Sequence, residues 1–327
     1  MNPSGRLKKT IVSKVQESSI EPRNAPKILF IGGPTASGKS LLALQIARET
    51  SCEIINADSR QIYRNLSIGT SQPDSDAIQE IPHHLYAFLE PSEEFTAADF
   101  ERKASEVISQ IIGRGNLPIV VGGTGFYMKA LLHGVWPVGP RNEKLRKRLR
   151  AIHERHGIFF FHKMLMRLDP DSAANIAPQD TYRMIRALEI LFQSGIPRSQ
   201  LDRIQEERYN ALKYFMDPGR EKLHQNIEQR TNAMLAGGWI EEVKQLTAQY
   251  PGFENMPAAK SLGYFEILQH LNGQLNFEQC KEIINLRTKQ YAKRQRTWFR
   301  NQDHFEPLSS EEPLYKMIEF VLQWYRN

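Results

Sequence analysis

The chain has 327 residues, of which 40% are hydrophobic and 24% are charged, and its formal net charge is +6. These values are typical of a soluble globular protein with one large and one smaller domain, and no apolar run approaches the roughly 20 residues that a membrane-spanning helix needs. Two cysteines far apart, Cys52 and Cys280, exclude a disulfide framework and a zinc site, and they favour a reducing compartment, which we expect to be the cytoplasm.

A polar segment is expected to precede the fold. Residues 1–26 contain no apolar stretch followed by a small-residue cleavage site, which predicts a flexible tail and not a secretory signal. Residues 28–31 (ILFI) then predict a buried strand, and residues 40–49 predict a helix. Between them, residues 33–40 (GPTASGKS) match the phosphate-binding pattern G-x-x-x-x-G-K-S/T, in the strand-to-helix context that this pattern requires.

This loop predicts a site for a diphosphate or triphosphate group. Its glycines let backbone N–H groups turn toward anionic oxygens, and the following helix adds the partial positive charge of its N-terminus. Lys39 adds a full charge, and the Ser40 hydroxyl is a candidate Mg²⁺ ligand, joined by Asp58 through a water molecule. The predicted diphosphate contacts are Gly33, Pro34, Thr35, Ala36, Ser37, Gly38, Lys39 and Ser40.

Further along the chain, strands and helices alternate. Residues 53–57 predict a strand that ends at Asp58, and Thr96 with Asp99 predicts a capping box at the start of a helix that stops at Gly113. Residues 117–121 predict a third strand, followed by Gly122, Gly123 and Thr124. Alternating elements favour a parallel sheet with ligands at the carboxyl ends of the strands, where the loop, Asp58 and Thr124 all fall.

The composition changes near residue 140. Residues 140–212 are charged and mostly helical, residues 213–216 predict a strand, and helices are expected at 221–236, 239–249 and 277–299. We therefore expect an α/β fold, with a P-loop NTPase-like parallel sheet flanked by helices. Its catalytic core would comprise residues 27–139 and 213–327, and residues 140–212 would form a helical insertion domain.

Two segments are rich in lysine and arginine, residues 141–155 and 281–300. Local basic blocks suit a polyanionic partner, although a solvated helix face is the alternative for either block. In the second block, Tyr291 and Trp298 are seven residues apart and so share a helix face. Basic groups interleaved with aromatic rings suit a nucleic-acid strand, whose phosphates meet the cations and whose bases meet the rings. The alternative is an amphipathic helix with Trp298 in the core, and we expect both to hold, with the aromatic side packed and the basic side exposed.

The expected strand at residues 117–121 ends without a carboxylate, and a guanine-reading N-K-x-D is absent. A hydrolytic motor or switch is therefore disfavoured, and group transfer from a bound phosphate compound is favoured. Asp58 could then serve as a general base, or simply cap the turn that follows it. A nucleotide kinase and a non-catalytic RNA-binding module remain as alternative functions.

Taken together, several segments resemble one family, the tRNA dimethylallyltransferases, also called tRNA isopentenyltransferases. They are GPTASGKS (33–40), NADSRQIYR (56–64), IGT (68–70), PHHL (82–85), FTAADF (95–100), GGTGFYMKALLHG (122–134), RMIRALEI (183–190), SLGYFE (261–266) and TKQYAKRQRTWFR (288–300). No zinc finger follows them, which indicates the bacterial type. Arg60, Gln72, Tyr182 and Asn226 stand where the family commonly has Met, Lys, Gln and Arg.

The resemblance implies that a dimethylallyl group passes from dimethylallyl diphosphate to N6 of the adenosine 3′-adjacent to a tRNA anticodon. It implies that Asp58 accepts the N6 proton and that Thr124 contacts the pyrophosphate or the reacting amine. Lys39 and Mg²⁺ would stabilise the leaving pyrophosphate, and Arg230 would also contact that pyrophosphate. The enzyme would act as a monomer. The residues expected to contact tRNA are Asp58, Ser59, Arg60, Gln61, Arg146, Tyr182, Arg183, Met184, Ile185, Arg186, Lys260, Ser261, Leu262, Gly263, Tyr264, Phe265, Lys293, Arg294, Gln295, Arg296, Thr297, Trp298, Phe299 and Arg300.

Overall fold

The computed structural model describes residues 25–136, 138, 142–203, 206–301, 305–308 and 314–326. Most of the tail expected at residues 1–26 lies outside these ranges. The chain forms two compact units. The larger unit contains Pro22–Leu132 and Tyr209–Asn327, and the smaller one contains His133–Arg208.

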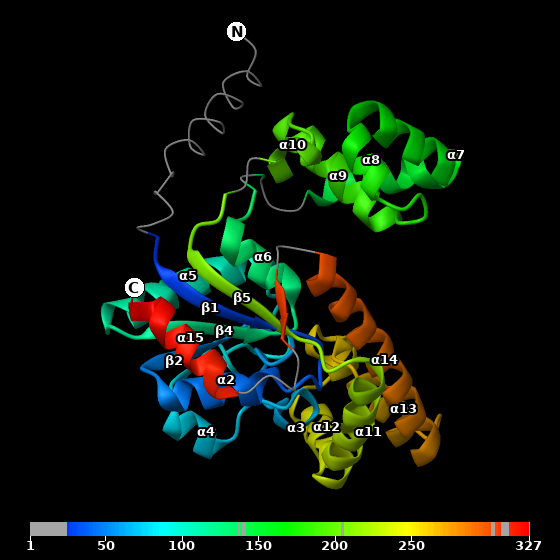
Figure 1. Ribbon diagram of the computed structural model, residues 1–327. Coiled ribbons are helices and arrows are strands. Elements are labelled where there is room, and N and C mark those ends of the chain that lie inside the picture. Colours follow the sequence, from blue (N-terminus) through cyan, green and yellow to red (C-terminus); the bar gives the residue numbers. More distant parts are fainter. Residues whose placement is uncertain are drawn as a thin grey trace. The chain divides into compact units, whose positions relative to one another are not determined.

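A six-stranded sheet forms the centre of the larger unit (Figure 1). Its order is β3-β2-β4-β1-β5-β6, and every pairing is parallel. This confirms the predicted α/β class. The strands are β1 (Lys27–Gly32), β2 (Cys52–Asn56), β3 (His83–His84), β4 (Leu117–Gly122), β5 (Asn210–Met216) and β6 (Glu306–Leu308).

Strand β5 begins three residues before the strand expected at residues 213–216. Its first residues, Asn210–Leu212, pair with Lys27–Leu29 of β1 but are only half-buried. The early part of the strand is therefore held by backbone pairing, and its residues do not form the apolar pattern from which a strand is predicted. The edge strands β3 and β6 have two and three residues, too few to show a periodic pattern.

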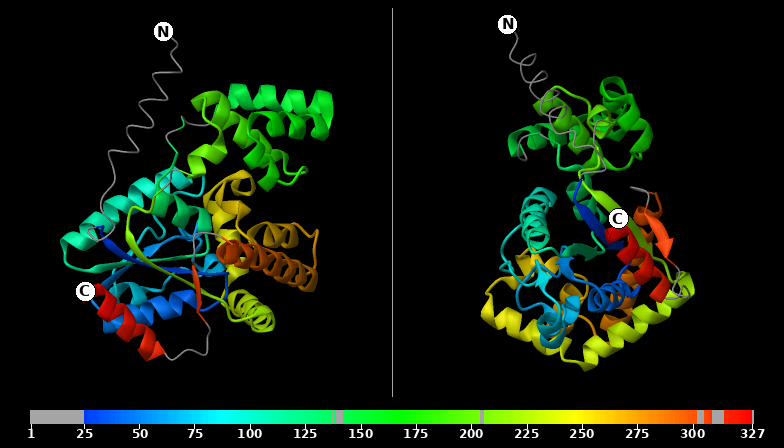
Figure 2. Two further views of the ribbon diagram at one scale, coloured as in Figure 1. Left: turned by 45° about the horizontal axis from the view of Figure 1, so that its top comes forward. Right: turned by 60° about the vertical axis from the view of Figure 1, so that its left-hand side comes forward.

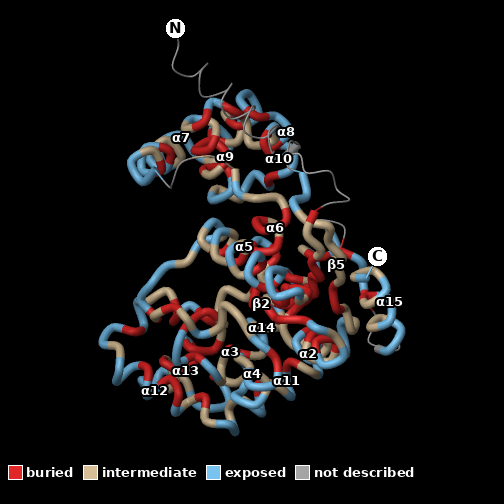
Figure 3. Tube along the Cα trace, turned by 90° about the vertical axis from the view of Figure 1, so that its left-hand side faces the viewer, coloured by how far each residue is buried: buried red, intermediate tan, exposed pale blue. Residues whose placement is uncertain are grey.

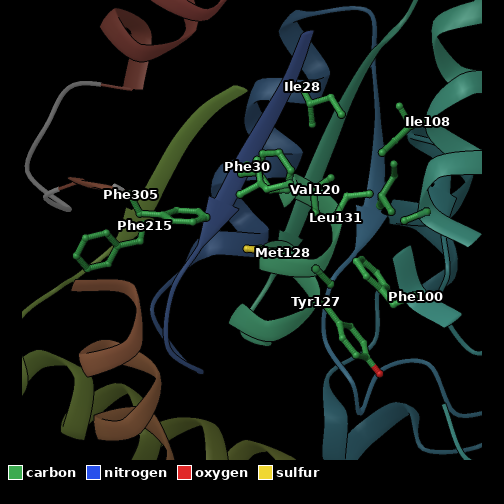
Figure 4. Close-up of a cluster of buried hydrophobic side chains, with 14 of the residues drawn as sticks. Ile28, Phe30, Phe100, Ile108, Val120, Tyr127, Met128, Leu131, Phe215 and Phe305 are labelled. Carbon is green, nitrogen blue, oxygen red and sulfur yellow. The ribbon is translucent and has the colours of Figure 1, made fainter. Parts of the chain in front are cut away.

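Both faces of the sheet are buried, as in other parallel sheets covered by helices. On one face, Ile28 and Phe30 of β1 pack with α5 (Ala97–Gly113) and α6 (Gly125–His133), as Figure 4 shows. On the other face, Leu29 and Ile31 pack with α2 (Lys39–Glu49) and α15 (Leu314–Arg326), and Figure 2 shows these layers from two further sides. The capping box predicted for α5 is present, since Thr96 and Asp99 exchange side-chain-to-backbone hydrogen bonds.

A second helical layer lies in the same unit. It contains α3 (Ser67–Thr70), α11 (Arg220–Ala236), α12 (Trp239–Gln249), α13 (Tyr264–Leu271) and α14 (Phe277–Asn301). The short helix α4 (Ser75–Glu80) is joined instead to α2, since its Glu80 pairs with Arg48 at 2.7 Å. Two 3₁₀ turns, Phe253–Asn255 and Ala258–Lys260, join α12 to α13. At its centre the Glu242 carboxylate accepts hydrogen bonds from the Ser67 hydroxyl, from the N–H groups of Ile68 and Gly69, and from the Tyr264 hydroxyl. These bonds fix the short α3 segment on α12 and α13.

The smaller unit is entirely helical in its described part. Its helices are α7 (Glu143–Leu168), α8 (Pro170–Asn175), α9 (Thr181–Ser194) and α10 (Arg198–Arg203). Helix α7 is interrupted at Gly157, whose φ is 78°. The core of the unit includes Leu149, Phe161 and Leu188, and Figure 3 shows buried residues in both units. Among the described helices of the whole chain, none has the length and apolar character needed to cross a membrane.

Candidate active site

The predicted phosphate-binding loop connects β1 to α2, at the carboxyl end of a central strand. Gly38 precedes α2 with a φ of 94°, in the left-handed region that favours glycine, and no side chain caps the first turn of the helix. The Ser37 hydroxyl is buried and has no hydrogen-bond partner among the described residues. Buried polar groups are normally paired, so this hydroxyl is available to a ligand that accepts hydrogen bonds.

Two cations lie beside this loop, Lys39, which is buried, and Arg230, which is half-buried. The Lys39 ammonium donates to the Pro34 carbonyl over 3.2 Å, and Arg230 of α11 donates to the Thr35 hydroxyl over 2.6 Å. Burial, the largest cause, lowers the pKa of Lys39 to about 8; the negative charge of Asp58 opposes this and the charge of Arg230 adds to it. Burial also lowers the pKa of Arg230. An anion bound between these two groups would relieve both effects.

Asn226, one of the departures from the family pattern, also contacts the loop. Its side-chain amide donates to the Ala36 carbonyl over 3.0 Å. It therefore supports the loop backbone where an arginine would add a third positive charge.

Asp58 follows β2, and the two oxygens of its carboxylate differ in their hydrogen bonding. Oδ1 accepts the Arg60 N–H over 2.8 Å, so Asp58 does cap the turn that follows it. Oδ2 has no hydrogen bond among the described residues. Asn56 holds the backbone of Asp58 by accepting its N–H over 2.8 Å. Asp58 can thus cap the turn through Oδ1 while Oδ2 remains available to accept a proton.

Thr124 follows β4 and lies directly against the Asp58 turn. Its N–H donates to the Ala57 carbonyl over 3.1 Å, and its Oγ1 accepts the Ser59 N–H over 3.0 Å. This closeness depends on Gly122, because a Cβ there would lie 2.1 Å from the Ala57 carbonyl oxygen. The sheet therefore brings the ends of β1, β2 and β4 together, as expected, with the loop, Asp58 and Thr124 at one edge.

Helix α14 contributes two further residues, Tyr291 and Gln295, and the sequence did not reveal the place of the second. Tyr291 is half-buried, and burial together with the charge of Asp58 raises its pKa well above the usual range. Gln295 is 5% exposed, and its side-chain amide contacts both the phosphate-binding loop and the β4 end. Tyr291 belongs to the aromatic side of this helix, which the sequence predicts to be packed. Gln295 was expected to contact tRNA, since nothing in the run of basic residues marks it as an inward position.

The basic residues of α14 are partly neutralised. Asp217 pairs with Arg296 at 2.7 Å and with Arg300 at 2.6 Å. Glu228 pairs with Lys289 at 2.6 Å, and Glu266 with Arg287. Lys293 and Arg294 are exposed and have no ion pair among the described residues, while Trp298 and Phe299 pack into the core of the sheet. The cationic surface of this helix is therefore smaller than its sequence indicates.

The other predicted RNA contacts in this unit also differ in whether their side chains are exposed or are held within the protein. Arg60 donates to the Pro257 carbonyl, and Gln61 donates to the carbonyls of Thr70 and Ser71. Gln72, a further departure, donates to the Gln61 and Tyr63 carbonyls. In segment 260–265, Lys260 and Phe265 are exposed, Leu262 is half-buried, and the rest is buried: Ser261, Gly263 and Tyr264. Exposed and buried neighbours alternate, so only part of each segment can reach a partner.

In the smaller unit, the Arg146 head group is buried. It pairs at 3.0 Å with Glu189, which is fully buried, and lies 5.8 Å from the Tyr182 ring centroid. Of the neighbouring predicted contacts on α9, Tyr182 and Arg183 are exposed, Arg186 pairs with Glu189 at 2.7 Å, and Met184 and Ile185 are buried. Arg146 thus has a structural partner besides any external one.

Replacing Arg146 with Ala should lower the free energy of unfolding of the helical unit by about 3 kcal/mol, because it leaves a buried carboxylate with one partner fewer. Urea unfolding followed by circular dichroism measures this change. Arg150→Ala is the control, since Arg150 lies exposed on the same helix. If both variants unfold alike and only RNA binding is weakened by Arg146→Ala, the contribution of Arg146 to stability is refuted.

Comparison with known protein families gives two matches. A family model described as IPP transferase matches residues 61–302, which is more than half of the chain, and one described as Isopentenyl transferase matches residues 26–87. A protein named tRNA dimethylallyltransferase from Geobacter sulfurreducens is 38% identical over 298 residues, covering 90% of this chain and 92% of the relative. Another of that name, from Anaeromyxobacter dehalogenans, is 41% identical over 278 residues, covering 84% and 92%.

Solved structures are similar as well. A tRNA isopentenylpyrophosphate transferase from Bacillus halodurans has a TM-score of 0.69 at 32% identity and covers 92% of this chain and 97% of its own. A eukaryotic dimethylallyltransferase acting on tRNA has a TM-score of 0.76 at 28% identity, covering 93% and 80%. The similarity therefore extends over both units of this chain, and these relatives are transferases and not nucleotide kinases.

Proposed function

We propose a mechanism from one established premise: this chain belongs to the tRNA dimethylallyltransferase family. It is accordingly a prenyltransferase that acts on tRNA. We propose that it modifies N6 of the adenosine 3′-adjacent to the tRNA anticodon. We propose that the donor is dimethylallyl diphosphate and that the site at the carboxyl ends of β1, β2 and β4 carries the reaction. The observation behind this proposal is the juxtaposition of an unsatisfied phosphate-binding loop with Asp58 and Thr124.

The phosphate-binding loop would hold the pyrophosphate of the donor. Its N–H groups, the Ser37 hydroxyl, Lys39 and Arg230 supply hydrogen bonds and positive charge where negative charge develops as the allylic C–O bond breaks. The electron pair of that bond leaves with the pyrophosphate. Because the donors are fixed before the reaction, they stabilise the leaving group without further rearrangement.

Asp58 and Thr124 would serve the acceptor. The N6 nitrogen of adenosine attacks the allylic carbon, forming the new C–N bond, and its proton passes to Oδ2 of Asp58, which no described residue occupies. Hydrogen bonds to Ser59 and Ala57 hold Thr124 beside the Asp58 turn. Its hydroxyl would orient the amine. The target base must first leave the anticodon stack, at a cost of a few kcal/mol.

A magnesium ion would bind at this site together with the donor. Among the described residues, no three His, Cys, Asp or Glu side chains are grouped so as to hold a metal by themselves. Mg²⁺ commonly takes most of its ligands from a phosphate substrate and water, with one or two protein oxygens, and the Ser40 hydroxyl and Asp58 carboxylate are oxygens of that kind. When bound, the ion would neutralise charge on the pyrophosphate.

The tRNA would contact the exposed part of the predicted RNA-binding set, including Lys293, Arg294 and Lys260 in the larger unit and Arg183 in the smaller one. The helical unit, described above as His133–Arg208, would act as the insertion domain that contacts the anticodon stem-loop. The free, buried cysteines Cys52 and Cys280 agree with action in the cytoplasm. We expect a monomer, because the sequence contains no heptad repeat.

Incubation with dimethylallyl diphosphate, Mg²⁺ and unmodified tRNA should yield N6-dimethylallyladenosine, which nucleoside analysis by mass spectrometry detects. The control is a tRNA whose target adenosine is replaced by guanosine, which should remain unmodified. Absence of the product across several tRNAs that carry the target adenosine would overturn the proposal. Phosphoryl transfer from ATP to a small acceptor would indicate a kinase instead.

A further inference from the structure

Helix α14 approaches the ends of β1 and β4 at three positions, and the chain has glycine at each. A Cβ at Gly32 would lie 2.2 Å from the Phe299 ring, and one at Gly125 would lie 2.2 Å from the Trp298 ring. A Cβ at Gly123 would lie 2.1 Å from Nε2 of Gln295. A larger residue at Gly32 or Gly125 would therefore displace a packed aromatic ring of α14, and one at Gly123 would push the end of the Gln295 side chain away.

The contact at Gln295 is a hydrogen-bonded bridge. Its Oε1 accepts the Thr35 N–H over 2.9 Å, and its Nε2 donates to the Gly123 carbonyl over 2.8 Å. Thr35 belongs to the phosphate-binding loop, and Gly123 directly precedes Thr124. A side-chain amide is suited to this position because it offers an acceptor and a donor at one end. Buried at 5% exposure, it links the two loops directly.

Helix α14 is held in register so that Gln295 reaches both loops. Asp217, just after β5, pairs with Arg296 and Arg300, which lie one and five residues beyond Gln295 on the helix. Phe299 stacks on Phe215 of β5, with ring centroids 6.1 Å apart. These anchors join α14 to the sheet itself, so the position of Gln295 is determined by the core and does not depend on a bound ligand.

We propose that Gln295 is a positioning residue, which fixes the distance between the phosphate-binding loop and Thr124. This inference rests on the proposed function. In that reaction, the bridge sets how far the allylic carbon of the bound donor lies from the amine that attacks it. Gln295 itself touches neither substrate. This assignment differs from the expectation, drawn from the resemblance, that Gln295 contacts tRNA along with its exposed neighbours on α14.

Gln295→Met tests the bridge, because methionine keeps the length and removes both hydrogen bonds. We expect kcat for prenyl transfer to fall by about 10- to 100-fold, as misplacement of reacting groups by a fraction of an ångström to 1 Å would do. The dissociation constant for tRNA, measured by filter binding, should change by less than about twofold. Gln290→Met is the matched control, since Gln290 is exposed on the same helix. It should leave both values unchanged.

Gln295→Glu gives a readout that a merely structural role would not produce. A deprotonated glutamate can accept the Thr35 N–H but presents a second acceptor to the Gly123 carbonyl, whereas a protonated one restores both bonds. Burial raises the pKa of such a carboxyl. The activity of this variant relative to the native enzyme should therefore increase as the pH is lowered, and the ratio cancels the pH dependence of the chemistry itself.

The outcomes separate the two proposals. An inactive native enzyme would refute the proposed function, whatever the variants do. A native enzyme that transfers the prenyl group, with a Gln295→Met variant of equal kcat or of weaker tRNA binding alone, would refute the bridge. If Gln295→Met lowers the melting temperature, Gln295→Glu decides: a pH-independent activity ratio refutes the bridge, and a ratio that rises toward low pH supports it.

Discussion

Replacing Asp58 with Asn should lower kcat for prenyl transfer by about 10²- to 10⁴-fold, the range expected for loss of a general base. Asparagine keeps an oxygen that can accept the Arg60 N–H, as Oδ1 of Asp58 does at 2.8 Å. The turn should therefore persist, while the basic Oδ2 is replaced by an amide that cannot accept a proton. Single-turnover kinetics with saturating tRNA and donor measure the effect on the chemical step.

Two further variants separate basicity from turn geometry. Asp58→Ala removes both the base and the turn bond, and we expect it to be at least as slow as Asp58→Asn. Asp74→Asn is the matched control, because Asp74 also accepts a backbone N–H, that of Ala77 at 2.8 Å, at the start of α4. A nearly native rate for the Asp58→Asn enzyme would mean that the carboxylate serves only the turn.

Replacing Lys39 with Met should lower kcat by about 10²- to 10³-fold, comparable to removal of one donor that stabilises charge in a transition state. Methionine fills a similar volume at the buried start of α2, so the loop should retain its fold. The loss should be specific to the leaving group, with tRNA affinity unchanged. Steady-state kinetics with varied donor measure it, and Lys316→Met, at an exposed position on α15, is the control.

The same lysine predicts a dependence on pH. Because its pKa is lowered to about 8 by burial, Lys39 loses its proton near that pH in the free enzyme, and a bound pyrophosphate favours the charged form. Affinity for the donor should therefore fall above pH 8, by up to about tenfold per pH unit. The donor itself contributes little, since a phosphate loses its last proton near pH 6. A KM equally steep in pH for the Lys39→Met variant would assign the titration to another group.

Local signals in the sequence were sufficient for the sheet and for the position of the site. The phosphate-binding loop, Asp58 and Thr124 were each expected at the carboxyl end of a buried strand, and the structure places them together. This worked because apolar runs, glycine turns and the capping box at Thr96 act on neighbouring residues, so the sequence displays them directly. The parallel order of the strands then brings their ends to one edge.

What the sequence by itself determined is therefore the fold class, the family and the position of the predicted phosphate-binding loop. The tertiary structure decided which basic and polar side chains are available. Arg146 is turned inward to Glu189, Arg296 and Arg300 share Asp217, and Gln295 joins Thr35 to Gly123. Most of these partners are dozens to hundreds of residues apart in the chain, and a helical run of charged residues looks the same whichever face is buried. Only the packing of α14 and α9 against their neighbours separates a cation that meets RNA from one that holds the fold.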